Sequence, residues 1–216
     1  MAKKIKLASF DLDGTLTPVD TLGFVIKKLR PTFFDKYQML EDAIHSDTIQ
    51  YDKGLREQLQ LISGLSVSEI ESVIKDLPLL RNSREALMLL KEKGIKILLL
   101  TDNPDVFCLP LLKHLPIDHI LSSKTIIEGD IVKGISFALS DKAKALTNFI
   151  GNLDIPLDSI VHIGDWKNDI PVFKIVGFSI ALNPREKIVS ENAKATIRTN
   201  DMMIVARKII EFDSYI

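Results

Sequence analysis

The chain has 216 residues, of which 46% are hydrophobic, and its formal net charge at pH 7 is −1. Because one domain commonly takes about 100–200 residues, we expect one large core with a modest insertion. The near-neutral charge offers no general attraction to phosphate backbones, and no segment approaches the roughly 18 apolar residues of a membrane span. We therefore expect neither a nucleic-acid nor a membrane partner.

Cysteine usage and the N-terminus bear on the cellular compartment. The single cysteine, Cys108, excludes an intrachain disulfide and fits a reducing cytosol. We interpret it as a small buried hydrophobic residue. The first apolar run ends at Asp11, which makes it too short for a signal-peptide core. The expected location is the cytoplasm.

The first part of the chain predicts one strand followed by a helical segment. Residues 5–10 are mostly apolar, which predicts a buried strand. Between residues 20 and 76, apolar residues recur every three or four positions, which predicts four helices without an intervening strand. Ser66 and Glu69 form a capping box that begins the last of these helices. We call residues 17–80 the helical insertion.

After the insertion, helices and apolar strands alternate. Asn82 and Glu85 are expected to cap a helix that ends at Gly94. Strands are expected over 95–100, 117–121, 159–163 and 178–182, a hairpin over 124–137, and helices over 104–114, 141–151, 168–176, 185–192 and from 201.

Such alternation is typical of a mostly parallel sheet covered on both faces by helices. The predicted fold is α/β, a doubly wound three-layer sandwich with a small α-helical domain inserted after the first strand. The predicted domains are a core formed by residues 1–16 and 81–216, and the helical insertion, residues 17–80.

Two aspartates directly follow the first strand. Asp11 and Asp13 are two positions apart, so on an extended chain their side chains project to the same face. Carboxylates this close repel each other unless a cation lies between them or one of them holds a proton. Gly14 supplies a tight turn, and Thr15 can hydrogen-bond the turn backbone. Because Mg²⁺ prefers oxygen ligands, a magnesium site is the first hypothesis.

Two other interpretations compete for this segment. Asp13-Gly14 between apolar residues is also a two-residue hairpin signal. An EF-hand calcium loop is excluded, because its fifth and twelfth positions are occupied here by Thr15 and Leu22.

The ends of the other predicted strands distinguish these interpretations. Thr101 follows the strand over 95–100, and Gly164-Asp165 follows the strand over 159–163. Ligands bind beyond the carboxyl ends of parallel strands, so polar residues at several strand ends indicate one composite site. A hairpin would not predict this coincidence.

These strand-end segments resemble the four signature motifs of the haloacid dehalogenase (HAD) superfamily of phosphohydrolases. The matching segments are Asp11-Leu12-Asp13-Gly14-Thr15, Thr101, a lysine that opens a later helix, and Gly164-Asp165 with Asn168-Asp169. The resemblance spans nearly the whole chain. It implies a HAD-like fold and a Mg²⁺-dependent phosphomonoester hydrolase that acts on a small phosphorylated metabolite through an aspartyl-phosphate intermediate.

The resemblance also implies roles for these residues. Asp11 would be the nucleophile, and Asp13 would be the general acid and then the general base. Magnesium would be held by the Asp11 carboxylate, the Asp13 backbone carbonyl and Asp165, with Asp169 orienting its water shell.

Other residues would surround the phosphoryl oxygens. Thr101 supplies a hydroxyl, the segment around Gly14 and Thr101 supplies backbone amides, and Asn168 could contact the phosphate. Lys142 and Lys144 both lie in the first turns of the helix after Ser140. We choose Lys142, because residues 141–146 resemble the superfamily's Lys-Gly-x-Ala-Leu variant.

The helical insertion is similar in size and position to the cap of phosphoserine phosphatases. Those enzymes have an acidic residue shortly after the first motif that reads the substrate amine, and Asp20 occupies that position. They also have an aromatic residue followed seven positions later by an arginine that reads the carboxylate. Here Tyr51 is followed by Gln58 instead. Arg56 comes two positions early, about 200° around a helix, so it is not a simple substitute.

The second motif departs from the same pattern. Thr101-Asp102-Asn103 replaces the Ser-Gly-Gly of phosphoserine phosphatases, and Asp102 adds negative charge where a substrate carboxylate would lie. Both departures weigh against phosphoserine as the substrate. For Asp20, Tyr51 and Arg56, an ordinary structural role remains as open as a substrate contact.

Several alternatives remain open. A phosphotransferase or mutase would share the aspartyl-phosphate step, and a non-catalytic binding protein could keep the fold without the chemistry. Trp166 could line the site entrance or pack against the insertion. The oligomeric state is open between monomer and homodimer. The four histidines show no metal-ligand spacing and are interpreted as structural: His45, His114, His119 and His162.

Overall fold

The computed structural model describes residues 4–214 except 152 and 154, and its centre is one mostly parallel sheet. The sheet has seven strands in the order β4-β3-β2-β1-β5-β6-β7, and only β3 and β4 pair antiparallel. The strands are β1 (Leu7–Phe10), β2 (Lys96–Pro104), β3 (His119–Glu128), β4 (Ile131–Phe137), β5 (Ile160–Gly164), β6 (Phe178–Leu182) and β7 (Ala195–Ile197).

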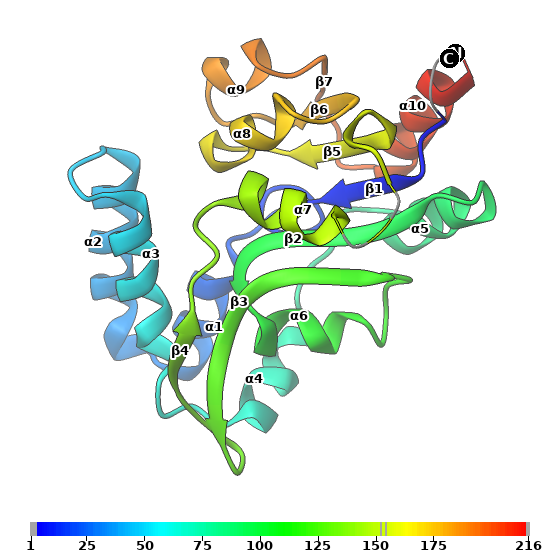
Figure 1. Ribbon diagram of the computed structural model, residues 1–216. Helices are drawn as coiled ribbons and strands as arrows, with labels where there is room; N and C mark the ends of the chain where they lie inside the picture. The colour runs from blue at the N-terminus through cyan, green and yellow to red at the C-terminus, as the bar shows by residue number, and fades with distance from the viewer. Residues whose placement is uncertain (1–3, 152, 154, 215–216) are drawn as a thin grey trace.

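Helices cover both faces of this sheet, with α7 on the near face in Figure 1 and α5 behind it. The α-helices are α1 (Thr21–Leu29), α2 (Phe34–His45), α3 (Tyr51–Leu59), α4 (Val67–Ile74), α5 (Ser83–Glu92), α6 (Asp105–Leu111), α7 (Lys142–Ile150), α8 (Ile170–Phe173), α9 (Lys187–Glu191) and α10 (Met202–Ser214). No helix in residues 4–151 or 155–214 is both long and apolar enough to span a membrane.

Alternate residues of the central strands pack on opposite faces. Leu7 and Leu98 belong to an apolar cluster with residues of α7 and α8, whereas Ala8 and Leu99 belong to a cluster with residues of α5 and α10. A strand buried on both faces has no polar positions to alternate with, which explains its continuous apolar sequence. The predicted α/β three-layer fold is confirmed.

The helical insertion contains α1 to α4, and the carboxyl ends of β1 and β5 point toward α2 and α3 in Figure 1. Asp20 begins α1 by accepting a hydrogen bond from the Gly23 amide, and the predicted capping box of Ser66 and Glu69 is present at α4. Apolar residues of α1, α3 and α4 join the same cluster as the α5 face of the sheet. The division into two domains stays a prediction, and its outer bounds, 1 and 216, lie outside the described residues.

The insertion and the β3–β4 hairpin are joined by backbone hydrogen bonds. The Gly64 amide donates to the Val132 carbonyl and the Val67 amide donates to the Asp130 carbonyl, each at 2.7 Å. Val132 donates in turn to Leu65 at 3.0 Å. The predicted hairpin therefore belongs both to the edge of the sheet and to the wall that supports α4.

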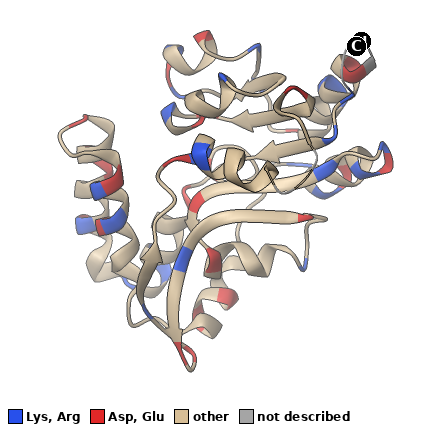
Figure 2. Cartoon of the chain, in the orientation of Figure 1, with Lys and Arg blue, Asp and Glu red and all other residues tan. Residues whose placement is uncertain are grey.

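Charge is unevenly distributed over these elements. Figure 2 shows both signs along α2 and α3, whereas β5 and β6 carry no charged residue. The outer helices thus present a mixed surface, and a concentration of one sign is found at the strand ends, described below.

One local expectation was wrong, one strand was missed, and one alternative that the sequence disfavoured is excluded. Asn82 does not cap α5 with its side chain. Its backbone adopts a left-handed conformation, and its side-chain amide donates to the Asp201 carboxylate at 2.9 Å instead. The strand β7 was not predicted, because its three residues form a half-buried edge without a continuous apolar run. The hairpin interpretation of Asp13-Gly14 also fails, because β1 pairs in parallel with both of its neighbours.

Candidate active site

The site forms where three neighbouring parallel strands end. Asp11 follows β1 and is 5% exposed, and its amide donates to the Ile163 carbonyl of β5 at 2.9 Å. Asp102 lies near the carboxyl end of β2, and Asp165 directly follows β5. The strand order therefore brings together carboxylates that are far apart in sequence.

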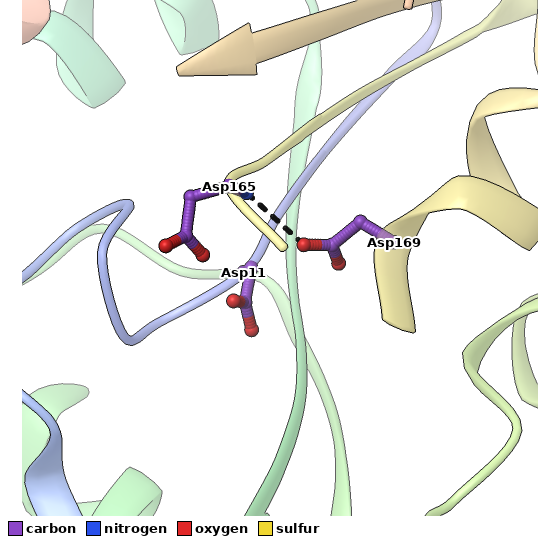
Figure 3. A group of neighbouring side chains, drawn as sticks. All are labelled: Asp11, Asp165 and Asp169. Carbon is purple, nitrogen blue, oxygen red and sulfur yellow. Dashed lines mark hydrogen bonds between the residues drawn. The ribbon is translucent and has the colours of Figure 1, made fainter. Parts of the chain in front are cut away.

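Asp11, Asp165 and Asp169 form a buried acidic cluster (Figure 3). Each offers one oxygen, and these oxygens lie within 4.8 Å of one another. Asp169 is fixed by its other oxygen, which accepts hydrogen bonds from the amides of Asp165 (3.1 Å) and Trp166 (3.3 Å). Burial is the main reason that the pKa of Asp165 is raised to about 6, and Arg185 opposes this rise.

The donor atoms of this cluster are of the kind that binds a divalent cation. Burial and the neighbouring carboxylates raise the pKa of Asp11 well above its ordinary value, although Lys142 opposes the rise. Like charges held this close become favourable when a cation lies between them. Three carboxylate oxygens form a hard donor set of the kind that Mg²⁺ and similar ions prefer.

Lys142 lies beneath this cluster, with an exposed fraction of 2%. Its ammonium group is 2.8 Å from Asp11 and 2.7 Å from Asp169. These two carboxylates hold the pKa of Lys142 above its ordinary value, although burial alone would lower it. Lys144, the alternative weighed from the sequence, is exposed. Of the two lysines, only Lys142 lies within reach of Asp11.

A buried histidine supports Asp169 from behind. His162 lies 3.1 Å from the same Asp169 oxygen that bonds Lys142, and its other ring nitrogen lies 3.0 Å from the Ser9 hydroxyl. Burial lowers the pKa of His162. Burial would raise the pKa of Asp169, but Lys142 and His162 hold it well below its ordinary value. His162 therefore has the predicted structural role, and the residue that it supports, Asp169, belongs to the site.

Asp13 is not part of the acidic cluster, and it lines a cavity. Its carboxylate accepts hydrogen bonds from the Thr21 hydroxyl and, at 2.9 Å, from the Asn103 amide. Burial is the largest cause of its raised pKa, about 8, and the charge of Asp20 adds to it. Asp13 is therefore held largely protonated at neutral pH, as a general acid requires. The predicted metal contact through its backbone carbonyl stays a prediction.

The residues at the end of β2 are bonded to one another. Asn103 donates to the Thr101 hydroxyl at 3.2 Å as well as to Asp13, so it fixes both. Asp102 accepts hydrogen bonds from the Tyr51 hydroxyl and, at 3.0 Å, from the Asn168 amide. The predicted phosphate contacts of Thr101 and Asn168 stay predictions, but Thr101 is linked to Asp13 through Asn103, and Asn168 lines the same cavity as Asp11 and Asp13.

A cavity of about 80 Å³ opens above Asp11 and Asp13 and is roofed by the helical insertion. Asp20, Tyr51, Gln58 and Trp166 all line it. Trp166 also packs against the insertion, with its ring centroid 5.8 Å from that of Tyr51, so both of its proposed roles hold. The lining residues are Asp11, Asp13, Asp20, Leu22, Glu41, Ile44, His45, Tyr51, Leu55, Gln58, Leu59, Asp102, Asn103, Trp166, Asn168 and Arg185.

Arg56 lies outside the cavity, as the helical rotation predicts. It pairs with Asp52 on the same helix at 3.1 Å, and both side chains are half exposed. Asp20 has two functions, since it caps α1 and also lines the cavity. Cys108 is fully buried, as expected.

Three lining residues were missed in the sequence. Glu41 shares a helix face with Tyr37 and Ile44. A charged residue within this apolar stripe was the sequence feature that could have identified it as a site residue. Arg185 comes three residues after β6, where the same strand-end rule applies, and it bonds Asp165 at 2.8 Å. His45 lines the cavity, with its ring edge-on to that of Trp166. The spacing of the histidines in the sequence did not indicate this position.

Replacing Gly14 by Ala should remove the response to a divalent metal. Gly14 has φ +74°, and a Cβ there would lie 2.1 Å from a carboxylate oxygen of Asp165. We expect a loss of about 1–3 kcal/mol of stability and the displacement of Asp165 from the cluster. The measurement is the shift in Tm on adding MgCl₂.

The matched control is Gly94→Ala. Gly94 has φ +80°, but its Cβ would meet nothing within 4 Å, so this variant carries the backbone cost alone. It should keep the magnesium-induced shift in Tm. A normal shift in Gly14→Ala would show that the close approach of Gly14 to Asp165 does not matter for metal binding.

Comparison with known proteins identifies relatives along nearly the whole chain. The model of the haloacid dehalogenase-like hydrolase family matches residues 8–174. A phosphoserine phosphatase of Methanocaldococcus jannaschii is 24% identical over 214 residues, which cover 97% of this chain and 100% of that protein. A phosphoserine phosphatase of Archaeoglobus fulgidus is 24% identical over 205 residues, which cover 93% of this chain and 59% of that protein.

Solved structures show the same architecture. A substrate-bound phosphoserine phosphatase matches with a TM-score of 0.81 and 21% identity, over 97% of this chain and 99% of that one. A HAD family hydrolase from Salmonella enterica matches with a TM-score of 0.81 and 18% identity, over 90% and 68%. At these identities the likeness establishes the fold.

Proposed function

The chain belongs to the haloacid dehalogenase-like hydrolase family and is a phosphatase of that family, and we propose that it hydrolyses a small phosphomonoester with the help of magnesium. One observation carries this proposal. A buried carboxylate, Asp11, lies at the end of β1 against Lys142 and within a cluster of acidic oxygens, and it lines a cavity.

Asp11 and Asp13 divide the chemistry between them. The Asp11 carboxylate attacks phosphorus, the bond to the alcohol oxygen breaks, and Asp13 gives its proton to that oxygen. The aspartyl phosphate on Asp11 is then hydrolysed by water, whose proton returns to Asp13. Its raised pKa suits Asp13 to both transfers, and Thr21 and Asn103 hold it in place.

Asp11, Asp165 and the Asp13 carbonyl would hold magnesium, with Asp169 orienting its water ligands. Bound there, magnesium would supply positive charge to the phosphoryl oxygens. Lys142 neutralises Asp11 from the opposite side, which lets an anionic phosphate approach a carboxylate. Thr101 and the amides near Gly14 and Asp102 would provide donors around the phosphate.

We further propose that the protein acts in the cytoplasm, as its one buried cysteine suggests, as a monomer or homodimer.

Phosphate release from a panel of small phosphomonoesters, including p-nitrophenyl phosphate, tests this function. We expect turnover with MgCl₂, loss of turnover after treatment with EDTA, and recovery when MgCl₂ is restored in excess. Absence of turnover for every ester by folded, magnesium-supplied protein would refute the proposed function.

A further inference from the structure

The part of the cavity that lies beyond Asp11 and Asp13 is acidic. Three further carboxylates line it: Asp20 from the start of α1, Glu41 from α2 and Asp102 from β2. They surround the position that the non-phosphate end of a substrate bound at Asp11 must occupy. An anionic group at that end would be repelled by all three.

Neutral groups bond these three carboxylates and leave their charge in place. Asp20 accepts from the Tyr37 hydroxyl, and Asp102 accepts from the Tyr51 hydroxyl. Glu41 accepts from the Gln58 amide at 2.7 Å and also lies 3.3 Å from His45, which is charged only when protonated.

The two strong cations at the site are already paired. Lys142 lies between Asp11 and Asp169, and Arg185 bonds Asp165 at 2.8 Å. Both cations therefore already neutralise carboxylates of the inner cluster, and the three outer carboxylates outnumber Arg185, the strong cation that lines the cavity with them. The electrostatic character of the outer cavity follows from Asp20, Glu41 and Asp102.

Two further observations also favour a positively charged ligand. The rings of Tyr51 and Trp166 line the same cavity with their centroids 5.8 Å apart, and aromatic faces attract cations. The side-chain carbonyl oxygen of Asn168 is buried without a hydrogen-bond partner among the described residues, although its amide bonds Tyr51 and Asp102. A buried acceptor of this kind needs a donor.

We propose that the phosphate ester accepted by this cavity carries a primary ammonium group and no carboxylate, so the substrate class is O-phosphorylated amino alcohols. The inference rests on the proposed function and extends it. A primary ammonium provides three N–H donors to acidic acceptors, which a quaternary ammonium cannot do.

The test compares kcat/KM, with MgCl₂, for 2-aminoethyl phosphate, its neutral analogue 2-hydroxyethyl phosphate, O-phosphoserine and 2-(trimethylammonio)ethyl phosphate. We expect kcat/KM for 2-aminoethyl phosphate to exceed that for each of the other esters by about tenfold or more, because its ammonium group would lie close to the carboxylates of the cavity. Equal or faster hydrolysis of the hydroxyethyl ester or of phosphoserine would overturn the inference. A preference for the trimethylammonio ester would overturn the primary-ammonium assignment.

Glu41→Gln should lower the ratio of kcat/KM for the aminoethyl ester to that for the hydroxyethyl ester about tenfold. Asp42→Asn is the matched control, because Asp42 is the next residue on α2, is exposed and lies outside this cavity. It should leave the ratio unchanged. An unchanged ratio in Glu41→Gln, with circular dichroism like that of the wild type, would contradict the role of Glu41.

Two more variants keep the inference testable if Glu41→Gln does not fold. Asp102→Asn should lower the same ratio, and Gln58→Arg should lower it by placing a cation beside Glu41. The proposed function and the substrate class fail differently. If no ester, p-nitrophenyl phosphate included, is hydrolysed, both fail; if the hydroxyethyl and nitrophenyl esters are hydrolysed without any preference for the aminoethyl ester, only the substrate class fails.

Discussion

Asp11→Asn is expected to lower turnover by about four orders of magnitude or more while leaving the protein folded, because an amide is a far weaker nucleophile toward phosphorus than a carboxylate. Asp11 lies beside Asp165 and Asp169, so the substitution also removes repulsion between buried carboxylates. Lys142 keeps Asp169 as a partner at 2.7 Å. The measurements are phosphate release in MgCl₂ and thermal unfolding of the same sample.

A second readout separates nucleophilic attack from charge effects. After a rapid acid quench, wild-type protein incubated with a ³²P-labelled ester should retain label on the chain, and Asp11→Asn should retain none. Asp35→Asn is the control, since Asp35 is an exposed aspartate of α2 far from the cavity lining. Persistent turnover in Asp11→Asn would assign the nucleophile to another residue.

Lys142→Met should both destabilise the protein and reduce turnover. The lysine is buried between Asp11 and Asp169, and the removal of one partner from a buried ion pair typically costs about 3–5 kcal/mol. We expect turnover to fall about a thousandfold, because a fixed cation beside the transferring phosphoryl group is lost. Urea unfolding measures the first effect and phosphate release the second.

Lys144→Met is the matched control, since Lys144 lies two residues further along α7 and is exposed. Its stability should stay within about 0.5 kcal/mol of the wild type. Adding Asp169→Asn to Lys142→Met should restore part of the lost stability, because the double variant no longer buries an unpaired carboxylate at that position. Equal stabilities for Lys142→Met and Lys144→Met would contradict the buried ion pair.

The inner part of the site could be predicted because each residue follows a strand that is evident in the sequence. Asp11 and Asp165 come directly after mostly apolar runs, and parallel strands bring their carboxyl ends to one edge. The choice of Lys142 over Lys144 came from the superfamily resemblance. The roles assigned to these residues came from the same resemblance.

The outer part of the cavity could not be predicted in the same way. The contact of Asp102 with Tyr51 joins β2 to a helix 51 residues away, and no local pattern encodes that distance. The failure at Asn82 has a similar cause, since the C-terminal segment supplies its partner Asp201. The arrangement of Glu41 and Gln58 depends on how α2 packs against α3.

The backbone links between α4 and the β3–β4 hairpin divide the helical insertion into two parts with different freedom to move. Breaking the main-chain bonds at Gly64 and Val67 would require the sheet edge to open. Among the described contacts, α2 and α3 are held to the strand ends by side chains, such as the hydrogen bond of Ser140 to Asp52 and that of Tyr51 to Asp102. We therefore expect the α2–α3 pair to separate from the strand ends more readily than α4 separates from the hairpin.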